Sequence, residues 1–249
     1  MSDYNNAVSD TDAEVGHVTA AKVKNTLLLD AEREEDIERA AQIIRQGGLV
    51  AFPTETVYGL GASALDADAA RRIYAAKGRP SDNPLIIHLA RAEDAEEYAV
   101  TSELYYKLAQ RFMPGPITVI LPKKDIIPLS VTGGLPTVAV RVPLNIHAHK
   151  LISAVGVPVA APSANISGRP SATCARYCLE DFDGRIDAVL DGGDAAFGLE
   201  STIVKPDGDG LRLLRPGAVT PEELSSLGVP VTVDPSVTER FEGTPEAPG

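Results

Sequence analysis

Short apolar runs, separated by helical patterns and by turns of glycine, proline and serine, are the feature that most constrains how this chain of 249 residues can fold. The runs that we expect to form strands are residues 27–29, 49–52, 85–89, 117–121, 138–142, 157–161, 188–190, 201–204 and 211–214. Strands mixed with helices over about 200 residues predict one α/β domain built on a mixed sheet.

The helices are expected where apolar residues recur every three or four positions. The clearest pattern runs from Ile37 to Ile44 and should end at Gly47. Thr220 should begin a last short helix, because Thr-Pro-Glu-Glu combines a capping box with proline at the first helical position. The other helices are expected from an Asp66 cap to Ala76, as one continuous helix over about 92–112, and near 149–155.

The two ends of the chain differ in composition from the part between them. Residues 1–26 are polar and lack sustained periodicity, so we expect a disordered acidic arm. Residues 27–228 carry the strand and helix patterns and are expected to form the folded domain. Residues 229–249 are rich in Pro, Thr, Glu and Gly, and we expect a linker or tail there.

Charge and composition exclude several classes of protein. The formal net charge is −12, but residues 37–228 hold 22 acidic and 19 basic side chains, so a local anion site is compatible with the sequence and a broad nucleic-acid face is not favoured. A membrane span is not expected, and the first residues lack a secretory signal, so the cytoplasm is the expected location. Cys174 and Cys178 are interpreted as small core residues of a helix.

The common nucleotide, metal and hydrolase motifs are missing from the sequence. It contains no G-x-x-x-x-G-K-[ST], no third glycine after Gly59 and Gly61, no H-E-x-x-H and no G-x-S-x-G. The four histidines are too scattered to predict a metal site, so we expect no metal bound by a protein ligand set.

Polar and basic residues nevertheless follow the strands in a consistent way. The strand at 49–52 runs into PTETVYGLG, at the carboxyl end of a strand, where open α/β sheets bind ligands. The next loop, 77–84, presents Lys77 and Arg79 on either side of a glycine and is stiffened by Pro80 and Pro84, and rigid cations of this kind suit phosphate oxygens. His88 then shares a strand face with Ile86, either as a core histidine or as part of a site.

Three later segments add to this set. Arg141 lies inside an apolar strand, where a cation needs an anionic partner or ligand. The turn at 162–170 is dense in hydroxyl and amide side chains, and Ser201 and Arg215 lie at strand ends. Together these residues predict an anionic ligand surrounded by Lys77, Arg79, Arg141 and Arg215.

The order of seven segments resembles a known family. FPTETVYGLG, KGRPSDNPLIIH, MPGPITVIL, TVAVRVP, APSANISGRPS, GLESTIV and LRPG are similar to the YrdC-like domain of the L-threonylcarbamoyladenylate synthases, over roughly residues 28–217. The resemblance implies an α/β fold with a twisted, open mixed sheet and flanking helices around a basic cavity. It also implies a nucleotidyltransferase that joins L-threonine, bicarbonate and ATP, with Mg2+, into threonylcarbamoyl-AMP and pyrophosphate.

The resemblance also implies roles for individual residues. The residues implied to contact ATP are Arg79, Asn83, Thr137, Ser163, Ser171 and Arg215. The residues implied to surround L-threonine are Thr56, His88, Arg141, Ala161 and Ser201. Lys77 and Arg79 are expected to be catalytic because they can offset triphosphate charge. The expected partners are these substrates and the downstream proteins that transfer the threonylcarbamoyl group to adenosine 37 of tRNA.

Alternatives and one departure remain open from the sequence. An RNA-binding module without catalysis is the first alternative, and direct tRNA binding is left open. A carbamoyl-transfer domain of the hydrogenase-maturation type is the second, although the acylphosphatase and zinc-finger regions that it would require are not found in the sequence. Residues 243–249 resemble the start of a linker that leads to a second domain in some family members, so a truncated two-domain enzyme and a one-domain form with a tail are both considered.

Overall fold

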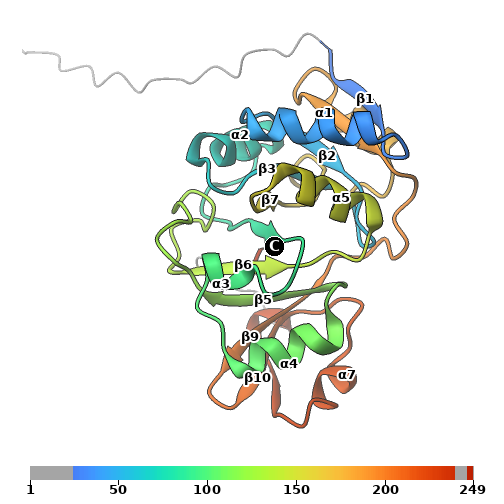
Figure 1. Cartoon of the computed structure of the whole chain (residues 1–249). Coiled ribbons are helices and arrows are strands. Elements are labelled where there is room, and N and C mark those ends of the chain that lie inside the picture. The colour runs from blue at the N-terminus through green and yellow to red at the C-terminus, as the bar shows by residue number, and fades with distance from the viewer. Residues whose placement is uncertain (1–24, 239–245, 249) are drawn as a thin grey trace, which may run out of the picture.

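The computed structural model describes residues 25–238 and 246–248. Within these residues the strands form one eleven-stranded sheet in the order β1-β8-β2-β3-β7-β4-β6-β5-β9-β10-β11. Parallel and antiparallel pairs alternate irregularly, and the edge strands β1 and β11 do not pair with each other, so the sheet is mixed and open. The expected α/β fold with an open mixed sheet and flanking helices is therefore confirmed (Figure 1).

The elements follow one another closely along the chain. The strands are β1 (Leu27–Asp30), β2 (Val50–Phe52), β3 (Gly59–Ser63), β4 (Ile86–His88), β5 (Ile117–Pro122), β6 (Thr137–Arg141), β7 (Val159–Ala161), β8 (Ala188–Asp191), β9 (Thr202–Asp207), β10 (Gly210–Arg215) and β11 (Val231–Val233). The helices are α1 (Glu34–Arg45), α2 (Ala67–Lys77), α3 (Ala95–Tyr98), α4 (Glu103–Phe112), α5 (Ile146–Val155), α6 (Ala175–Phe182) and α7 (Pro221–Ser225), with a 3₁₀ turn at Pro235–Val237.

The two faces of the sheet bury different groups of helices. Along β2, Val50 and Phe52 pack with α1 and α5, whereas Ala51 packs in the cluster that contains residues of α2, α4, α6 and α7. Successive residues of a strand point to opposite faces, so these clusters lie on opposite sides of the sheet. Figure 1 shows α1 and α5 lying together over the part of the sheet that includes β2, β3 and β7.

A third, smaller cluster lies on a part of the sheet to which none of the described helices contributes a buried side chain. It contains Ile86, Ile120, Ala139, Ile203 and Leu214, and Ala247 is the one partly buried apolar residue packed on it among the described residues. The register places Ile86 opposite both Ala161 and Ala139, and Ala139 opposite Ile120. A row of small and medium apolar side chains therefore crosses four neighbouring strands and forms the floor of this region.

The single helix expected over about 92–112 was wrong, because the chain forms two helices there. Ala99 adopts an extended conformation, with φ −142° and ψ 164°, and makes an antiparallel bridge to Lys123. The Ser102 side chain then accepts from the backbone N–H of Tyr105 and caps α4. Apolar residues recur at helical spacing throughout 92–112, so the sequence predicts one helix. The backbone bridge between Ala99 and Lys123 holds Ala99 in an extended conformation and so interrupts that helix.

Two strands were not expected from the sequence. Residues 59–63 form β3, and the absence of a side chain at Gly61 lets this strand pack closely, because a Cβ there would lie 2.8 Å from the Phe52 ring. Residues 231–233 form β11, which pairs in parallel with β10. The domain therefore extends past residue 228, where a linker or tail was expected. The expected arm at 1–26 lies outside the described residues except for its last two positions.

Candidate functional site

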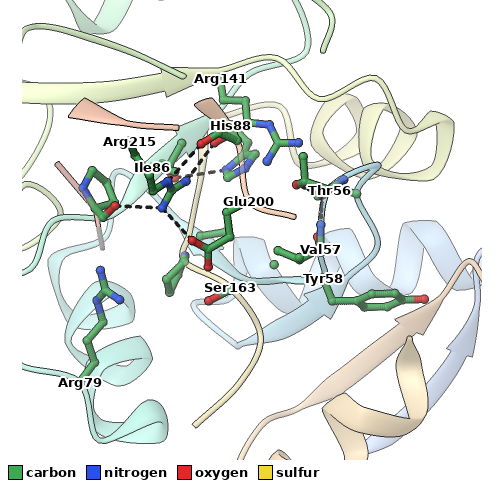
Figure 2. Close-up of a pocket in the computed structure, with 16 residues that line it drawn as sticks. Thr56, Val57, Tyr58, Arg79, Ile86, His88, Arg141, Ser163, Glu200 and Arg215 are labelled. Carbon is green, nitrogen blue, oxygen red and sulfur yellow. Dashed lines mark hydrogen bonds and ion pairs between the residues drawn. The ribbon is translucent and has the colours of Figure 1, made fainter. Parts of the chain in front are cut away.

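A pocket lies on the part of the sheet that carries the third, smaller cluster (Figure 2). It is bounded by strand ends, by the turn after β2 and by the segment after β7. Its lining residues are Thr54, Thr56, Val57, Tyr58, Gly59, Arg79, Ile86, His88, Arg141, Ala161, Pro162, Ser163, Glu200, Ser201, Arg215 and Pro248. Three arginines and one carboxylate line it, so the cationic cavity that the resemblance implied is present.

The sheet register brings the polar residues of the pocket together. His88 and Arg141 are direct partners across the parallel pair β4 and β6. Each lies two residues beyond a member of the apolar floor, so each projects from the same face of the sheet as that floor. Ser201 precedes β9, and its hydroxyl lies 2.8 Å from the Thr118 hydroxyl of β5. Because every second residue of a strand projects from the same face, the apolar residues Ile86 and Ala139 are followed on that face by the polar residues His88 and Arg141.

Arg141 forms a buried ion pair with Glu55. The Arg141 Nη2 donates to Glu55 Oε1 at 2.6 Å, and each side chain is 5% exposed. Over the described residues, Arg141 Nε and Glu55 Oε2 have no hydrogen-bond partner. The strand cation therefore has the anionic partner that its burial requires, and it retains an unpaired N–H group beside the pocket.

His88 is a neutral, buried histidine that also lines the pocket. Burial, followed by the charge of Arg141, lowers the pKa of His88 to about 3. Its Nδ1 lies 3.2 Å from the carbonyl oxygen of Ile86, and its ring meets the Phe52 ring edge to face. Both interpretations of this residue apply together, because the side chain is part of the core and also contributes to a pocket wall.

The turn after β2 is held by its own hydroxyl groups. The Thr54 hydroxyl donates to the Val57 carbonyl at 2.6 Å and lies 2.9 Å from the Thr56 hydroxyl. Gly59 forms an antiparallel bridge with Ser163, which joins this turn to the segment after β7. Thr56 is fully buried in this arrangement and still lines the pocket.

Arg215 is fixed by several acceptors at the end of β10. Its Nε donates to the Ser201 carbonyl, its Nη2 donates to the Ser201 hydroxyl, and its Nη1 donates to the Pro248 carbonyl. The same Nη1 lies 3.1 Å from Oε2 of Glu200. The Ser171 hydroxyl donates to the other oxygen of that carboxylate, at 2.9 Å. Figure 2 shows Glu200 pointing toward the Arg215 guanidinium inside the pocket.

Arg79 and Lys77 leave the end of α2 in different directions. Arg79 Nη2 donates to the side-chain oxygen of Asn83, and the guanidinium reaches the pocket from the side opposite Arg141 (Figure 2). Lys77 is 1% exposed, and its Nζ donates to the carbonyl oxygens of Ser163 and Asn165, both at 2.5 Å. Burial, followed by the charge of Arg79, lowers the pKa of Lys77 to about 7. Its ammonium group therefore supports the turn at 163–165 from behind the pocket wall.

The structure separates the predicted site residues into two groups. Those that line the pocket are Arg79, Ser163, Arg215, Thr56, His88, Arg141, Ala161 and Ser201. Those that do not line it are Lys77, Asn83, Thr137 and Ser171. Asn83 and Ser171 each contact a lining residue, Thr137 begins β6, and a direct contact of Lys77 with phosphate stays a prediction. The ligand contacts of all these residues stay predictions.

Two carboxylates and one backbone group of the site were not predicted from the sequence. Glu55 lies inside the motif PTET, and Glu200 lies inside GLEST, but neither was assigned a role. The signal for Glu55 was available, because a strand arginine requires an anion. Pro248 reaches the pocket because Glu246 pairs with Lys205 at 2.6 Å and with Arg212 at 3.0 Å, which ties the segment 246–248 to β9 and β10.

Within residues 25–238 and 246–248, no three His, Cys, Asp or Glu side chains come together as metal ligands. None of the helices in the same part of the chain is long and apolar enough to cross a membrane.

The chain is similar in sequence to known proteins. A family model described as "Telomere recombination", for Sua5, YciO and YrdC proteins, matches residues 42–217. A protein of Pyrococcus abyssi named threonylcarbamoyl-AMP synthase is 50% identical over 221 residues, which cover 88% of this chain and 65% of the relative. A Bacillus subtilis protein of the same name is 46% identical over 218 residues, which cover 87% of this chain and 63% of the relative.

A solved structure shares the fold. The crystal structure of Pyrococcus abyssi Sua5 complexed with L-threonine matches with a TM-score of 0.86 and 49% identity, covering 90% of this chain and 66% of that one. The chain thus spans just under two thirds of the length of these relatives.

Proposed function

Because the chain belongs to the Sua5/YciO/YrdC family, we propose that it makes L-threonylcarbamoyl-AMP and pyrophosphate from L-threonine, bicarbonate and ATP. The observation that carries the proposal is one pocket with cations around it: Arg141 beside His88, Arg215 bonded to Ser201, and Arg79 on the side opposite Arg141 (Figure 2). The name of the two curated relatives and the L-threonine complex of the solved relative support the same activity.

L-Threonine is proposed to bind beside Arg141. Its carboxylate can pair with the guanidinium, which has an unpaired Nε–H among the described contacts. His88 is neutral and therefore adds no charge that would repel the threonine ammonium group. Ala161 and Ile86 give a small apolar surface of the size that suits a methyl group.

ATP is proposed to bind between Arg79 and Arg215, with Ser163 and Ser171 as hydrogen-bond donors to phosphate or ribose. The threonine amine takes up bicarbonate and loses water, and a carbamate forms. A carbamate oxygen then attacks the α-phosphorus, the bond to the β,γ-phosphate breaks, and pyrophosphate leaves with the bonding electrons. The described pocket holds no nucleophile paired with a base, so positioning and charge stabilisation are expected to supply catalysis.

Mg2+ is proposed to arrive with ATP, as a charge-neutralising ion on the phosphate groups. Mg2+ commonly keeps several waters and is held by substrate phosphates together with one or two carboxylates. The pocket offers Glu200 as its one carboxylate among the described lining residues, and Arg215 already pairs with it. This donor set does not fit a protein cage for the metal, so no step depends on one.

The test is release of pyrophosphate from ATP and Mg2+ by this chain, with and without L-threonine and bicarbonate. We expect pyrophosphate release that requires both L-threonine and bicarbonate. In Arg141→Ala the rate of release should fall at least tenfold, because the guanidinium that pairs with the L-threonine carboxylate is removed. Arg71→Ala is the matched control, since this arginine is 61% exposed and pairs with Asp68 at the surface of α2. Release that is independent of L-threonine would contradict the proposal.

The RNA-binding alternative is distinguished in the same preparation. Binding of tRNA that weakens steeply with salt, without any co-substrate-dependent release of pyrophosphate, would favour a module that binds RNA without chemistry. If the synthase reaction is present, we propose that its product is used by proteins that transfer the threonylcarbamoyl group to tRNA.

A further inference from the structure

Glu200 is a carboxylate in a place where the proposed function requires phosphate. It is the last residue before Ser201 and β9, and it lines the pocket together with Arg79, Arg141 and Arg215. No other acidic side chain lines the pocket within the part of the chain that the structure describes. An anion among three arginines that are assigned to anionic substrates needs a physical explanation.

The contacts of Glu200 connect two segments that are far apart in sequence. One oxygen accepts a hydrogen bond from the Ser171 hydroxyl at 2.9 Å, and the other lies 3.1 Å from Arg215 Nη1. Both partners are residues that we assign to ATP. The carboxylate therefore holds a serine from the loop before α6 and an arginine from β10 in fixed positions relative to each other.

The charge of Glu200 reaches further than its direct contacts. It raises the pKa of Arg215, Arg79 and Lys77, and so opposes the larger effect of burial, which lowers the pKa of each. The same charge must repel any phosphate group that comes close to these cations. Arg215 Nη1 already has two acceptors, the Glu200 carboxylate and the Pro248 carbonyl. A phosphate oxygen that binds this nitrogen must therefore displace one of them or share its N–H groups with them.

The contacts of Glu200 indicate a role in the nucleotide site, and this inference rests on the function proposed above. We propose that Glu200 is the counter-anion of the nucleotide site: it positions Arg215 and Ser171 for phosphate oxygens and weakens the hold of the site on pyrophosphate, so that this product leaves. Glu200 is therefore a positioning residue that acts through Arg215 and Ser171. Its negative charge, and not only its shape, is required for this role.

A purely structural role makes the opposite prediction. If Glu200 only holds Ser171 and Arg215 in place, then removing its charge loosens both, and phosphate ligands bind more weakly. If Glu200 also opposes phosphate, a neutral side chain of the same length strengthens binding. Glutamine separates the two cases, because its side-chain oxygen can still accept from the Ser171 hydroxyl while the charge beside Arg215 is gone.

The experiment is calorimetric titration of the 249-residue chain with pyrophosphate and, separately, with ATP, both in Mg2+. We expect Glu200→Gln to bind pyrophosphate about tenfold more tightly than the parent, as removal of one like charge at close range in a partly exposed site implies. The gain should shrink at high salt, because the Glu200 side chain is 36% exposed. Binding of L-threonine should not change.

Further variants separate charge from shape. Glu200→Met, also neutral but unable to accept from Ser171, should bind pyrophosphate more tightly than the parent as well. Glu200→Asp keeps the charge and should show no gain. Glu180→Gln is the matched control, because Glu180 lies on α6, is 58% exposed and pairs with Arg176.

The outcomes are distinct. Tighter pyrophosphate binding in both neutral variants, and in neither the aspartate variant nor the control, supports the proposal. Unchanged or weaker binding in Glu200→Gln, with L-threonine binding intact, overturns it and leaves the proposed function standing. If the parent chain binds neither ATP nor pyrophosphate, the proposed function fails, and this inference fails with it.

Discussion

The ion pair between Glu55 and Arg141 gives the sharpest test of how the site is held together. Both side chains are 5% exposed, and Oε1 of Glu55 lies 2.6 Å from Nη2 of Arg141. Glu55→Ala leaves the guanidinium buried without its anionic partner. Breaking a buried pair in this way costs about 3–5 kcal/mol of unfolding free energy. For a domain of this size that corresponds to a fall in melting temperature of roughly 6–20 °C.

The loss of unfolding free energy should arise because one charge of the pair stays buried without its partner. Arg141→Ala should cost a similar amount, because it leaves a buried carboxylate. The double variant should cost clearly less than the sum of the two single variants, since removing both charges also removes the desolvation penalty. The backbone bond from Phe197 N–H to the Glu55 carbonyl is present in every variant, so it does not bias the comparison.

The assay is equilibrium unfolding in urea, with the free energy compared among variants that share the same slope. Glu34→Ala is a control, because its pair with Lys150 joins side chains that are 74% and 40% exposed and should contribute less than about 1 kcal/mol. A loss below about 1 kcal/mol in Glu55→Ala, or simple additivity in the double variant, would refute the reasoning that this pair is a coupled, buried unit.

Three further predictions concern pH and packing. Burial lowers the pKa of Lys77 from 10.5 to about 7, so between these two pH values the unfolded chain binds more protons at this lysine than the folded chain does, and the free energy of unfolding should rise with pH. Lys77→Met should remove that part of the slope. The pKa of His88 is lowered to about 3, so below about pH 6.5 the unfolded state gains a proton that the folded state does not, and stability should fall by up to about 1.4 kcal/mol per pH unit from this group. His88→Asn should flatten that fall relative to the parent in unfolding experiments, and an NMR titration of His88 near pH 6.5 in the folded protein would contradict the argument. Gly61→Ala should destabilise by about 1–3 kcal/mol in urea unfolding, because its Cβ would lie 2.8 Å from the Phe52 ring and 2.9 Å from Val159 Cγ1; an unchanged stability would show that these side chains move aside freely.

Much of the fold could be predicted because local patterns agree with the tertiary structure. The helix from Glu34 to Arg45 buries Ile37, Ala40, Ala41 and Ile44, the residues that mark the pattern. The capping box at Thr220 is present with both of its hydrogen bonds. In each case the signal lies within one helix, so no knowledge of distant residues is needed.

What could not be predicted depends on partners far along the chain. The break between α3 and α4 comes from pairing of Ala99 with Lys123, and β3 forms because Gly61 packs against Phe52 and Val159. The same limit applies to the site. Arg141 was recognised as a cation in need of an anion, but its partner Glu55 lies 86 positions earlier, and only the register of β4 and β6 explains why His88 lies beside it.

The carbonyl of Pro248 accepts from Arg215, and Glu246 is clamped by Lys205 and Arg212. The carboxyl-terminal end of the described chain is thus part of the rim of the pocket. A purification tag or reporter fused after this segment would emerge beside the arginine that we assign to ATP, and an acidic tag there would compete with phosphate for it. Apparent nucleotide affinities should therefore differ between protein with such a tag and protein without it.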